Sequence, residues 1–382
     1  MITVYSPDHA LHDPPHEFLD GALVPVFESP VRAAIILEAL ERAGIGPVVP
    51  PRAFGVAPVR AVHSPDYLAY LERAYERWVA AGGAPEAVLP STLAVRWMSR
   101  RCESPLAAPG YYCFDLSAPI VPGTFRAALA SAAVALTGAA LLLDGERAAY
   151  ALCRPPGHHA GADMCGGYCF LNNAAIAAQY LLTLNAERRT LHDGVSDAVD
   201  GLSSAGGAGK NLQPSAFSLQ PSRVAVLDID FHHGNGTQQI FYERDDVLVV
   251  SLHADPAHQY PMFLGYADER GAGTGRGFNL NLPLPLGTTD GPYLEALDEA
   301  LAAVRAFAPA ALVVSAGFDT FIGDPVAAHG GGFALSAAAY PEVGRRIGAL
   351  GLPTLFVQEG GYGIAALGEN VVGLLRGFEE QA

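Results

Sequence analysis

Residues 224–241, VAVLDIDFHHGNGTQQIF, give the clearest indication of the fold class. The predicted strand Val224–Asp228 is almost wholly apolar, and acidic, imidazole and glycine residues follow it at once. Continuous apolar character is typical of a parallel strand that is covered by helices on both faces. Binding sites in parallel sheets form just beyond the carboxyl ends of the strands. We therefore expect a buried strand that carries polar side chains into a site.

Further strands of the same kind alternate with helical stretches rich in Ala and Leu. Strands are also expected at Ala148–Cys153, Val247–Leu252, Ala311–Ser315 and Thr354–Gln358. Helices are expected at Val31–Ala43, Pro65–Ala81, Thr124–Leu143, Asn173–Leu184, Tyr293–Ala306 and Ala337–Leu350. This alternation predicts an α/β fold with a central, mainly parallel sheet flanked by helices. Because no linker separates two cores, one catalytic domain is expected over residues 1–382.

Residues 185–222 differ from their surroundings in composition. They include the run GLSSAGGAGKNLQPSAFSLQPS, which is rich in Gly, Ser, Ala and Pro and has little periodic apolar content. Such a run is typical of a flexible surface insertion. The pattern leaves open whether this insertion is a functional lid or an inert excursion.

The overall composition bounds the class of protein. Of 382 residues, 50% are hydrophobic and 16% charged, and this excludes a disordered chain. The net charge of −16 argues against a nucleic-acid partner, which needs a basic face, and it suits a cationic substrate. Five cysteines without a Cys-x-x-Cys pair do not indicate a disulfide framework.

The location of the protein is predicted from two stretches. The first residues, MITVYSPDHALHD, lack the basic-then-apolar pattern of a signal peptide. The uncharged stretch Ala127–Leu143 falls short of about 20 residues and is bracketed by Arg126 and Asp144, so a buried core helix is expected there. We expect a soluble, cytoplasmic protein with no membrane partner.

Three residues that follow predicted strands form a candidate metal site. Asp230 and His232 are two positions apart at a strand end, so their side chains point to the same side. Asp319 follows another strand, in ALVVSAGFDTFIGDP. Two carboxylates and one imidazole suit Zn²⁺, and three protein ligands leave one position open for water and substrate. The pattern therefore predicts a catalytic zinc site.

Three more residues offer acid–base chemistry at the same edge of the sheet. RPPGHHAG supplies His158 and His159, and a histidine near its ordinary pKa of about 6.5 is the expected proton shuttle. QEGGYG supplies Tyr362, whose hydroxyl is expected to polarise a carbonyl group. The rings of Tyr168 and Tyr260 are expected to form a narrow slot for an alkyl chain.

These motifs together resemble the histone deacetylase superfamily, and within it the acetylpolyamine amidohydrolase branch. The resemblance runs from YSPDHALH through RPPGHHAG, GGYCFLNN, DIDFHHGNGTQ and FLGYADERG to EGGYG and the C-terminal GYGIAALGENVVGLLRG. It implies the arginase–deacetylase-type fold, one zinc ion per subunit and a structural monovalent cation, usually potassium. It also implies a homodimer in which residues 90–122 help to shape the entrance.

The resemblance assigns a role to each matching position. It implies that Asp230, His232 and Asp319 bind zinc, and that His159 is the general base and acid beside His158. Tyr362 matches the carbonyl-polarising tyrosine, and Gly167, Tyr168 and Tyr260 match the walls of the substrate tunnel. The remaining matches are Asp228 and Asn235 as partners of the two histidines, and a monovalent-cation site at Asp228, Asp230, His232, Ser251 and Leu252.

The implied reaction is zinc-dependent hydrolysis of the acetyl or acyl amide of a primary amine, either an acetylpolyamine or another small acetylated amine. Ser117 and Arg126 stand where such relatives are expected to carry entrance carboxylates, and an arginine there would repel a polycation. An acetyl-lysine deacetylase acting on proteins is an alternative. So are a binding module that retained the pocket and an arginase-like ureohydrolase, which would need a second metal and more Asp ligands.

Overall fold

The computed structural model describes residues 1–19, 21–183, 223–327 and 331–381. Its centre is one eight-stranded sheet with the order β4-β1-β5-β10-β9-β6-β7-β8. Every strand pairing described in this sheet is parallel, which confirms the predicted fold class. The strands are β1 (Ile2–Val4), β4 (Val48–Val49), β5 (Ala148–Ala151), β6 (Val224–Asp228), β7 (Val247–Ala254), β8 (Asn279–Leu284), β9 (Ala311–Ala316) and β10 (Thr354–Gln358).

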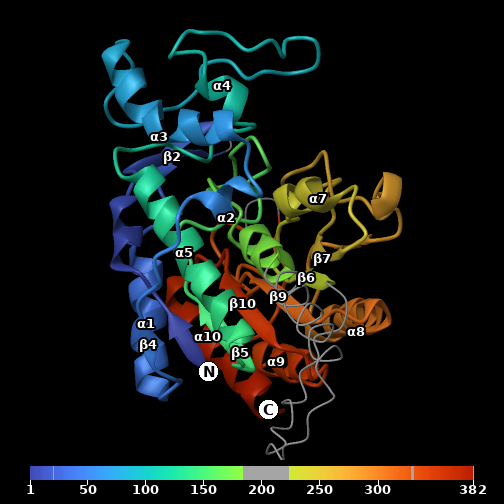
Figure 1. Ribbon diagram of the computed structural model, residues 1–382. Coiled ribbons are helices and arrows are strands. Elements are labelled where there is room, and N and C mark those ends of the chain that lie inside the picture. The colour runs from blue at the N-terminus through green and yellow to red at the C-terminus, as the bar shows by residue number, and fades with distance from the viewer. Residues whose placement is uncertain (20, 184–222, 328–330, 382) are drawn as a thin grey trace, which may run out of the picture.

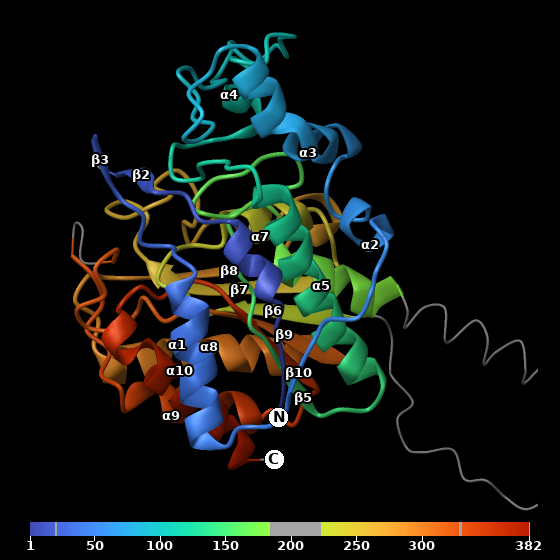
Figure 2. The same ribbon diagram turned by 90° about the vertical axis from the view of Figure 1, so that its left-hand side faces the viewer.

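Helices cover both faces of the sheet, as Figure 2 shows with the sheet seen between them. One face carries α1 (Val31–Ala43), α8 (Asp290–Phe307), α9 (Ala339–Gly348) and α10 (Ile364–Glu379). The other face carries α5 (Thr124–Leu143), the helical residues 173–183 and α7 (Asn235–Phe241). Successive side chains of a strand point to opposite faces, so the central strands contribute to both apolar cores.

The helix α5 is long and apolar enough to cross a membrane by composition alone. In the structure most of its residues are buried, and it packs along β5, β1 and β10. Its bounds are those expected from the sequence, and its burial agrees with the prediction of a core helix.

Smaller elements form a cap at one end of the molecule (Figure 1). A third apolar cluster joins residues from α3 and α4 to the near end of α5. The cap contains the helices α3 (Pro65–Ala80) and α4 (Pro109–Tyr112), and the hairpin of β2 (His16–Leu19) and β3 (Ala22–Pro25) lies near it. The other small elements are the helix α2 (Ala57–Arg60) and the 3₁₀ turns Pro7–Leu11, which packs on α5, and Gly273–Gly275.

The sequence pattern predicts the central strands and misses the peripheral ones. β1 and β4 are too short to show a period, and β8 alternates polar and apolar residues and contains Pro283. α10 is missed because glycines interrupt its pattern. A Cβ on Gly377 would lie 2.0 Å from the Pro341 carbonyl oxygen, so these glycines let α9 and α10 pack closely. The predicted insertion at residues 185–222 lies outside the described residues.

A buried ion cluster fastens α1 to the strand ends that form the site. Glu28 Oε1 accepts hydrogen bonds from Arg32 at 2.9 Å and from Arg154 at 2.8 Å. Arg32 also donates to the carbonyl oxygens of Glu359 and Gly361, at 2.6 and 2.7 Å. Burial opposes the charge of Glu28, but the two arginines hold its carboxyl pKa below the usual range. The cluster therefore fixes the loop after β10 by charge-assisted hydrogen bonds.

Glu28→Ala should destabilise the fold strongly. The substitution leaves two buried guanidinium groups without their carboxylate, which typically costs about 3–5 kcal/mol. The matched control is Glu369→Ala, because Glu369 pairs with Arg42 on the exposed surface, where a pair contributes about 0–1 kcal/mol. Urea unfolding of both variants measures the difference, and equal losses would contradict the role of the buried cluster.

Candidate active site

A cavity of about 240 Å³ opens at the carboxyl ends of the central strands. Its wall includes side chains from segments that are far apart in the sequence. Seven of the predicted site residues line it, namely His158, His159, Gly167, Tyr168, His232, Tyr260 and Tyr362. Leu19, Met262 and Val326 add apolar surface. The cavity is therefore a largely aromatic and apolar slot with imidazole and phenol groups exposed to it.

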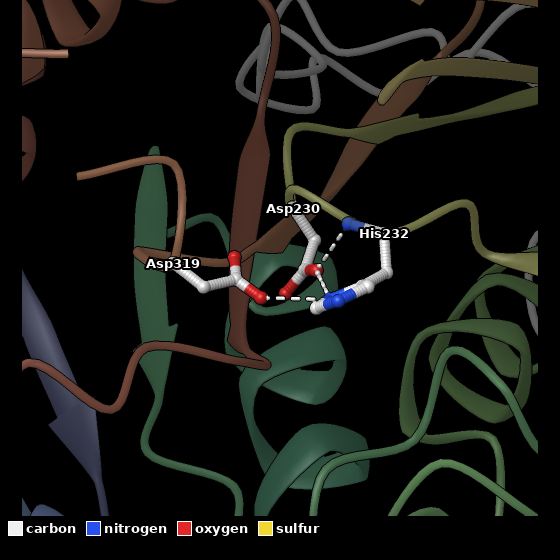
Figure 3. Close-up of side chains that lie close together, drawn as sticks. All are labelled: Asp230, His232 and Asp319. Carbon is white, nitrogen blue, oxygen red and sulfur yellow. Dashed lines mark hydrogen bonds and ion pairs between the residues drawn. The ribbon is translucent and has the colours of Figure 1, made fainter. Parts of the chain in front are cut away.

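Asp230, His232 and Asp319 converge beside this cavity (Figure 3). Their ligand atoms all lie within 4.8 Å of one another. His232 Nδ1 is 2.9 Å from Asp319 Oδ2 and 3.4 Å from Asp230 Oδ1. Asp230 and His232 follow β6 and Asp319 follows β9, the adjacent strand. The predicted ligand set thus meets at one point, since parallel strands end at the same edge of the sheet.

Backbone N–H groups hold the two carboxylates in place. Asp230 Oδ1 accepts from His232 N at 2.9 Å, and its Oδ2 accepts from Gly360 N at 2.9 Å. Asp319 Oδ1 accepts from Phe231 N at 3.0 Å. These bonds connect the ends of β6, β9 and β10, so the metal group is fixed by three strands.

The electrostatics of this group favour a bound cation. Burial and the nearby Asp230 carboxylate raise the pKa of Asp319 to about 7. Burial alone would lower the pKa of His232, but its hydrogen bonds to Asp230 and Asp319 raise it to about 9. Two buried carboxylates thus share the charge of one imidazolium. A divalent ion would balance the charge of both carboxylates and leave the imidazole neutral. One imidazole nitrogen and two carboxylate oxygens are donors that fit Zn²⁺.

The two adjacent histidines have different partners. His158 Nδ1 is 2.9 Å from Asp228 Oδ2, whereas His159 Nδ1 is 2.7 Å from Asn235 Oδ1. The two rings lie with their centroids 4.0 Å apart. The structure therefore pairs each histidine with the residue predicted for it, one a carboxylate and the other an amide.

Neither histidine keeps the ordinary pKa that the sequence analysis expected. Burial opposes charge on His158, but Asp228 and Asp230 raise its pKa to about 10. Burial, followed by the charges of His158 and His232, holds the pKa of His159 well below its usual range. The expectation fails because both rings are buried and one has an acidic partner. These surroundings favour a proton on His158 and a neutral imidazole on His159.

Tyr362 follows β10, and both its backbone and its ring have partners: Asp324 bonds to the backbone and Arg32 lies over the ring. Asp324 Oδ2 accepts from the backbone N–H groups of Tyr362 and Gly363, at 2.6 and 2.8 Å. The guanidinium of Arg32 lies 4.7 Å from the centre of the Tyr362 ring. Burial keeps the pKa of the phenol well above its usual value. Tyr362 therefore keeps its proton and can donate a hydrogen bond into the cavity.

Tyr168 and Tyr260 form opposite parts of the wall. The Tyr168 ring meets the Tyr362 ring edge-on at 5.6 Å, and the Tyr260 ring meets the His159 ring edge-on at 4.9 Å. Gly167 and Tyr168 both have positive φ angles, 52° and 66°, and this turn brings the Tyr168 ring into the cavity. The two aromatic walls lie where the sequence analysis expected them.

The expectation that Arg126 lies at the cavity entrance is wrong. Ser117 lines the cavity, but Arg126 is exposed on α5 and lines a separate, more open hollow with Asp13 and Glu86. Arg126 belongs to the first turn of α5, which begins at Thr124. Arg126 therefore gives no reason to expect that a polycation would be repelled from the cavity.

The residues predicted to bind a monovalent cation gather behind the metal group. Asp228 is paired with Ser251 in the register of β6 and β7, and Leu252 follows Ser251. Asp230 and His232 come directly after the same strand. The structure brings these residues together, while potassium itself stays a prediction.

Several residues that support the site are missed by sequence reasoning. They are Glu28, Arg32, Asp115, Asp324 and Glu359. Glu359 Oε2 accepts from the N–H groups of Gly157 and His158, at 2.6 and 3.2 Å, and thereby holds the histidine loop. The motifs FIGDP and QEGGYG contain Asp324 and Glu359, but the other three have no local signal because their partners come from distant segments.

Comparison with known proteins identifies relatives over the whole chain. A model of the histone deacetylase domain matches residues 26–191 and 212–378. The chain is 44% identical over 386 residues to acetylpolyamine amidohydrolase 2 of Pseudomonas aeruginosa, with 99% of each chain covered. It is 44% identical over 378 residues to the acetylpolyamine amidohydrolase of Mycoplana ramosa, again with 99% of each covered. A crystal structure of acetylpolyamine aminohydrolase from Burkholderia pseudomallei matches with a TM-score of 0.85 and 41% identity, covering 99% of this chain and 98% of that one.

The fold, the Asp–His–Asp group and these matches define the class: the chain belongs to the histone deacetylase family of hydrolases. Within that family it belongs to the acetylpolyamine amidohydrolase branch, because its full-length relatives at 44% identity are members of that branch. The resemblance and the arginase–deacetylase-type fold expected from the sequence are confirmed.

Gly360→Ala should weaken metal binding without unfolding the protein. A Cβ at this position would lie 2.6 Å from Asp230 Oδ2 and 2.7 Å from Asp319 Oδ2, so both carboxylates would be displaced. The matched control is Gly363→Ala, because nothing lies closer than 3.7 Å to its Cβ. Zinc affinity measured by calorimetry should fall by about 10- to 100-fold for the first variant only. Equal affinities for the two variants would contradict the assigned ligands.

Proposed function

We propose that the protein is a zinc-dependent amidohydrolase that removes an acetyl group from a primary amine of a small acetylated amine, with acetylpolyamines as the leading class. The observation that carries the proposal is the convergence of Asp230, His232 and Asp319 beside one cavity that also exposes His159 and Tyr362. The relatives named acetylpolyamine amidohydrolases support the reaction and the substrate class.

Each group in the cavity has a chemical task in such a hydrolysis. Zn²⁺ held by Asp230, His232 and Asp319 would polarise the amide carbonyl and lower the pKa of a water molecule. His159 is neutral and lines the cavity, so it can accept the proton of the attacking water at Nε2. Its Nδ1 is engaged with Asn235, which fixes the orientation of the ring.

The leaving amine also needs a proton, because an amide nitrogen leaves poorly as an anion. The proton accepted by His159 is available for this step. The cationic His158 beside it stabilises negative charge that develops in the cavity. Tyr362 is protonated and donates to the carbonyl oxygen as negative charge gathers there.

The shape and charge of the molecule support a small cationic amine as substrate. Tyr168 and Tyr260 form aromatic walls that suit an alkyl chain, and the cavity volume of about 240 Å³ suits a small group. The net charge of −16 attracts cations. Arg126, which would oppose a polyamine at the entrance, lies elsewhere.

We also propose a structural potassium ion at Asp228, Asp230, His232, Ser251 and Leu252, and a cytoplasmic homodimer. The loop before α4 supports the dimer, because it exposes Val95, Trp97 and Met98, with 84% of Trp97 accessible. An apolar surface of this kind is suited to contact with a second copy. Light scattering measures the mass in solution, and a monomer at all concentrations would contradict this part of the proposal.

The substrate class is tested with a panel of acetylated amines read by mass spectrometry. The panel contains acetylated polyamines, acetyl-lysine peptides and the same amines with longer acyl groups. We expect the highest kcat/KM for an acetylated polyamine and release of acetate. A preference for acetyl-lysine peptides would reject acetylpolyamines as the substrate class in favour of acetylated proteins. Zinc binding without turnover on any member of the panel would refute the enzymatic proposal.

Tyr362→Phe should retain zinc and lose about 10²- to 10³-fold in kcat, because the transition state loses one hydrogen-bond donor. His159→Ala should lose about 10²- to 10⁴-fold, because no other group takes over the proton transfer. The control is Tyr75→Phe, whose hydroxyl bonds to the carbonyl of Pro85 outside the cavity, and it should keep full activity. Near-normal turnover in either cavity variant would reject the role given to that residue.

A further inference from the structure

Asp115 is a half-buried carboxylate that belongs neither to the metal group nor to the histidine pair. It lies on the loop that follows α4 (Pro109–Tyr112). Its Oδ2 accepts hydrogen bonds from the Tyr260 hydroxyl at 2.7 Å and from the backbone N–H of Gly167 at 2.8 Å. Ser117 adds its hydroxyl to Oδ2 at 3.0 Å and its backbone N–H to Oδ1 at 3.1 Å. One carboxylate thus accepts four hydrogen bonds.

These hydrogen bonds join three separate segments of the cavity wall. Ser117, Gly167 and Tyr260 all line the cavity, whereas Asp115 stands behind them. Three of the four donors bond to Oδ2 and the fourth bonds to Oδ1. The arrangement of Asp115 therefore indicates a junction between wall segments.

The junction reaches the histidine pair through Tyr260 and Gly167. The Tyr260 ring meets the His159 ring at 4.9 Å with an interplanar angle of 90°. A Cβ on Gly167 would lie 2.4 Å from His159 Cδ2 and 2.8 Å from the Tyr260 hydroxyl oxygen. The wall is thus packed directly against the base, and a shift of Tyr260 would change both the width of the slot and the surface of His159.

We infer that Asp115 is a positioning residue that holds Tyr260 and the Gly167 turn in place and thereby sets the width of the slot for the alkyl chain of the amine. The inference rests on the proposed function, because it specifies which amine chains the same cavity accepts. Its basis is the arrangement of four donors from three segments around one carboxylate.

The hydrogen bond between Tyr260 and Asp115 explains why a carboxylate is needed at position 115. Burial raises the pKa of the Tyr260 phenol well above its usual value, so Tyr260 remains a donor. An asparagine at position 115 keeps one acceptor oxygen and presents an N–H₂ group to whatever donor lies on the other side. Asp115→Asn therefore removes at least one of the bonds and releases part of the wall. Tyr260→Phe removes the hydroxyl alone and leaves the ring, so it tests the same contact with little risk to the fold.

The experiment compares kcat/KM for an acetylated straight-chain amine and for the same acetylated amine with a methyl branch on its alkyl chain. In the wild-type protein we expect a strong preference for the straight chain, because a branch widens the chain where it passes Tyr260. In Tyr260→Phe and in Asp115→Asn this preference should fall about tenfold, with KM for the straight-chain amine raised and its kcat changed less than about threefold. The double variant should lose no more preference than Asp115→Asn alone, because Asp115 acts through Tyr260.

The matched control is Asp66→Asn. Asp66 also accepts a hydrogen bond from a tyrosine, Tyr112, at 3.2 Å, but it does not line the cavity. This variant should keep the wild-type preference. An unchanged preference in both cavity variants, an equal loss in Asp66→Asn, or additive losses in the double variant would each overturn the inference.

A second readout separates this inference from the proposed function. Straight-chain and branched alkyl hydroxamates bind metal without being hydrolysed, and calorimetry on the zinc-loaded protein gives their affinities. The wild-type protein should lose affinity when the chain is branched, and Tyr260→Phe should lose less. Absence of hydrolysis by the wild-type protein would refute the proposed function, whereas an unchanged effect of the branch in Tyr260→Phe would refute the role of Asp115.

Discussion

The mutual repulsion of two buried carboxylates is the constraint on which the site depends. Asp230 and Asp319 lie at the ends of adjacent strands within the interior, where an uncompensated charge is costly. Each carboxylate accepts hydrogen bonds from backbone N–H groups of neighbouring strand ends, and His232 supplies the remaining positive charge. A divalent ion resolves the same repulsion more completely, since it balances both carboxylates and binds a neutral imidazole. The strand ends, the glycines around them and the histidine loop are arranged to keep these carboxylates together.

The surroundings of this group give two chemically identical side chains different properties. His158 and His159 are adjacent in the chain, but one contacts the carboxylate of Asp228 and the other the amide of Asn235. The carboxylate stabilises an imidazolium, whereas the amide adds no charge, and the cation of His158 further disfavours a second cation beside it. The surroundings therefore favour the charged form of one histidine and the neutral form of the other. The buried Glu28–Arg32–Arg154 cluster extends this arrangement to α1, because Arg32 bonds to the loop that carries Tyr362.

The sequence predicts those parts of the molecule that have a local signature. The strands β5, β6, β7, β9 and β10 are continuous apolar runs, and Asp230, His232 and Asp319 follow them at positions where a parallel sheet brings its ends together. The strand β8 and the helix α10 escape prediction, because β8 alternates like a surface strand and glycines interrupt α10. The positions of Asp115 and Arg126 depend on how remote loops pack. For this reason the sequence pattern misses the role of the first and places the second wrongly at the cavity entrance.

The most direct test of the central claim is a crystal structure of the zinc-loaded protein with anomalous scattering recorded at the zinc absorption edge. We expect one strong anomalous peak per subunit at the Asp230–His232–Asp319 group. The peak should lie about 2.0–2.2 Å from His232 Nδ1 and from one oxygen of each carboxylate. A zinc ion bound elsewhere, or an imidazolium still shared between the two carboxylates in the presence of saturating zinc, would contradict it.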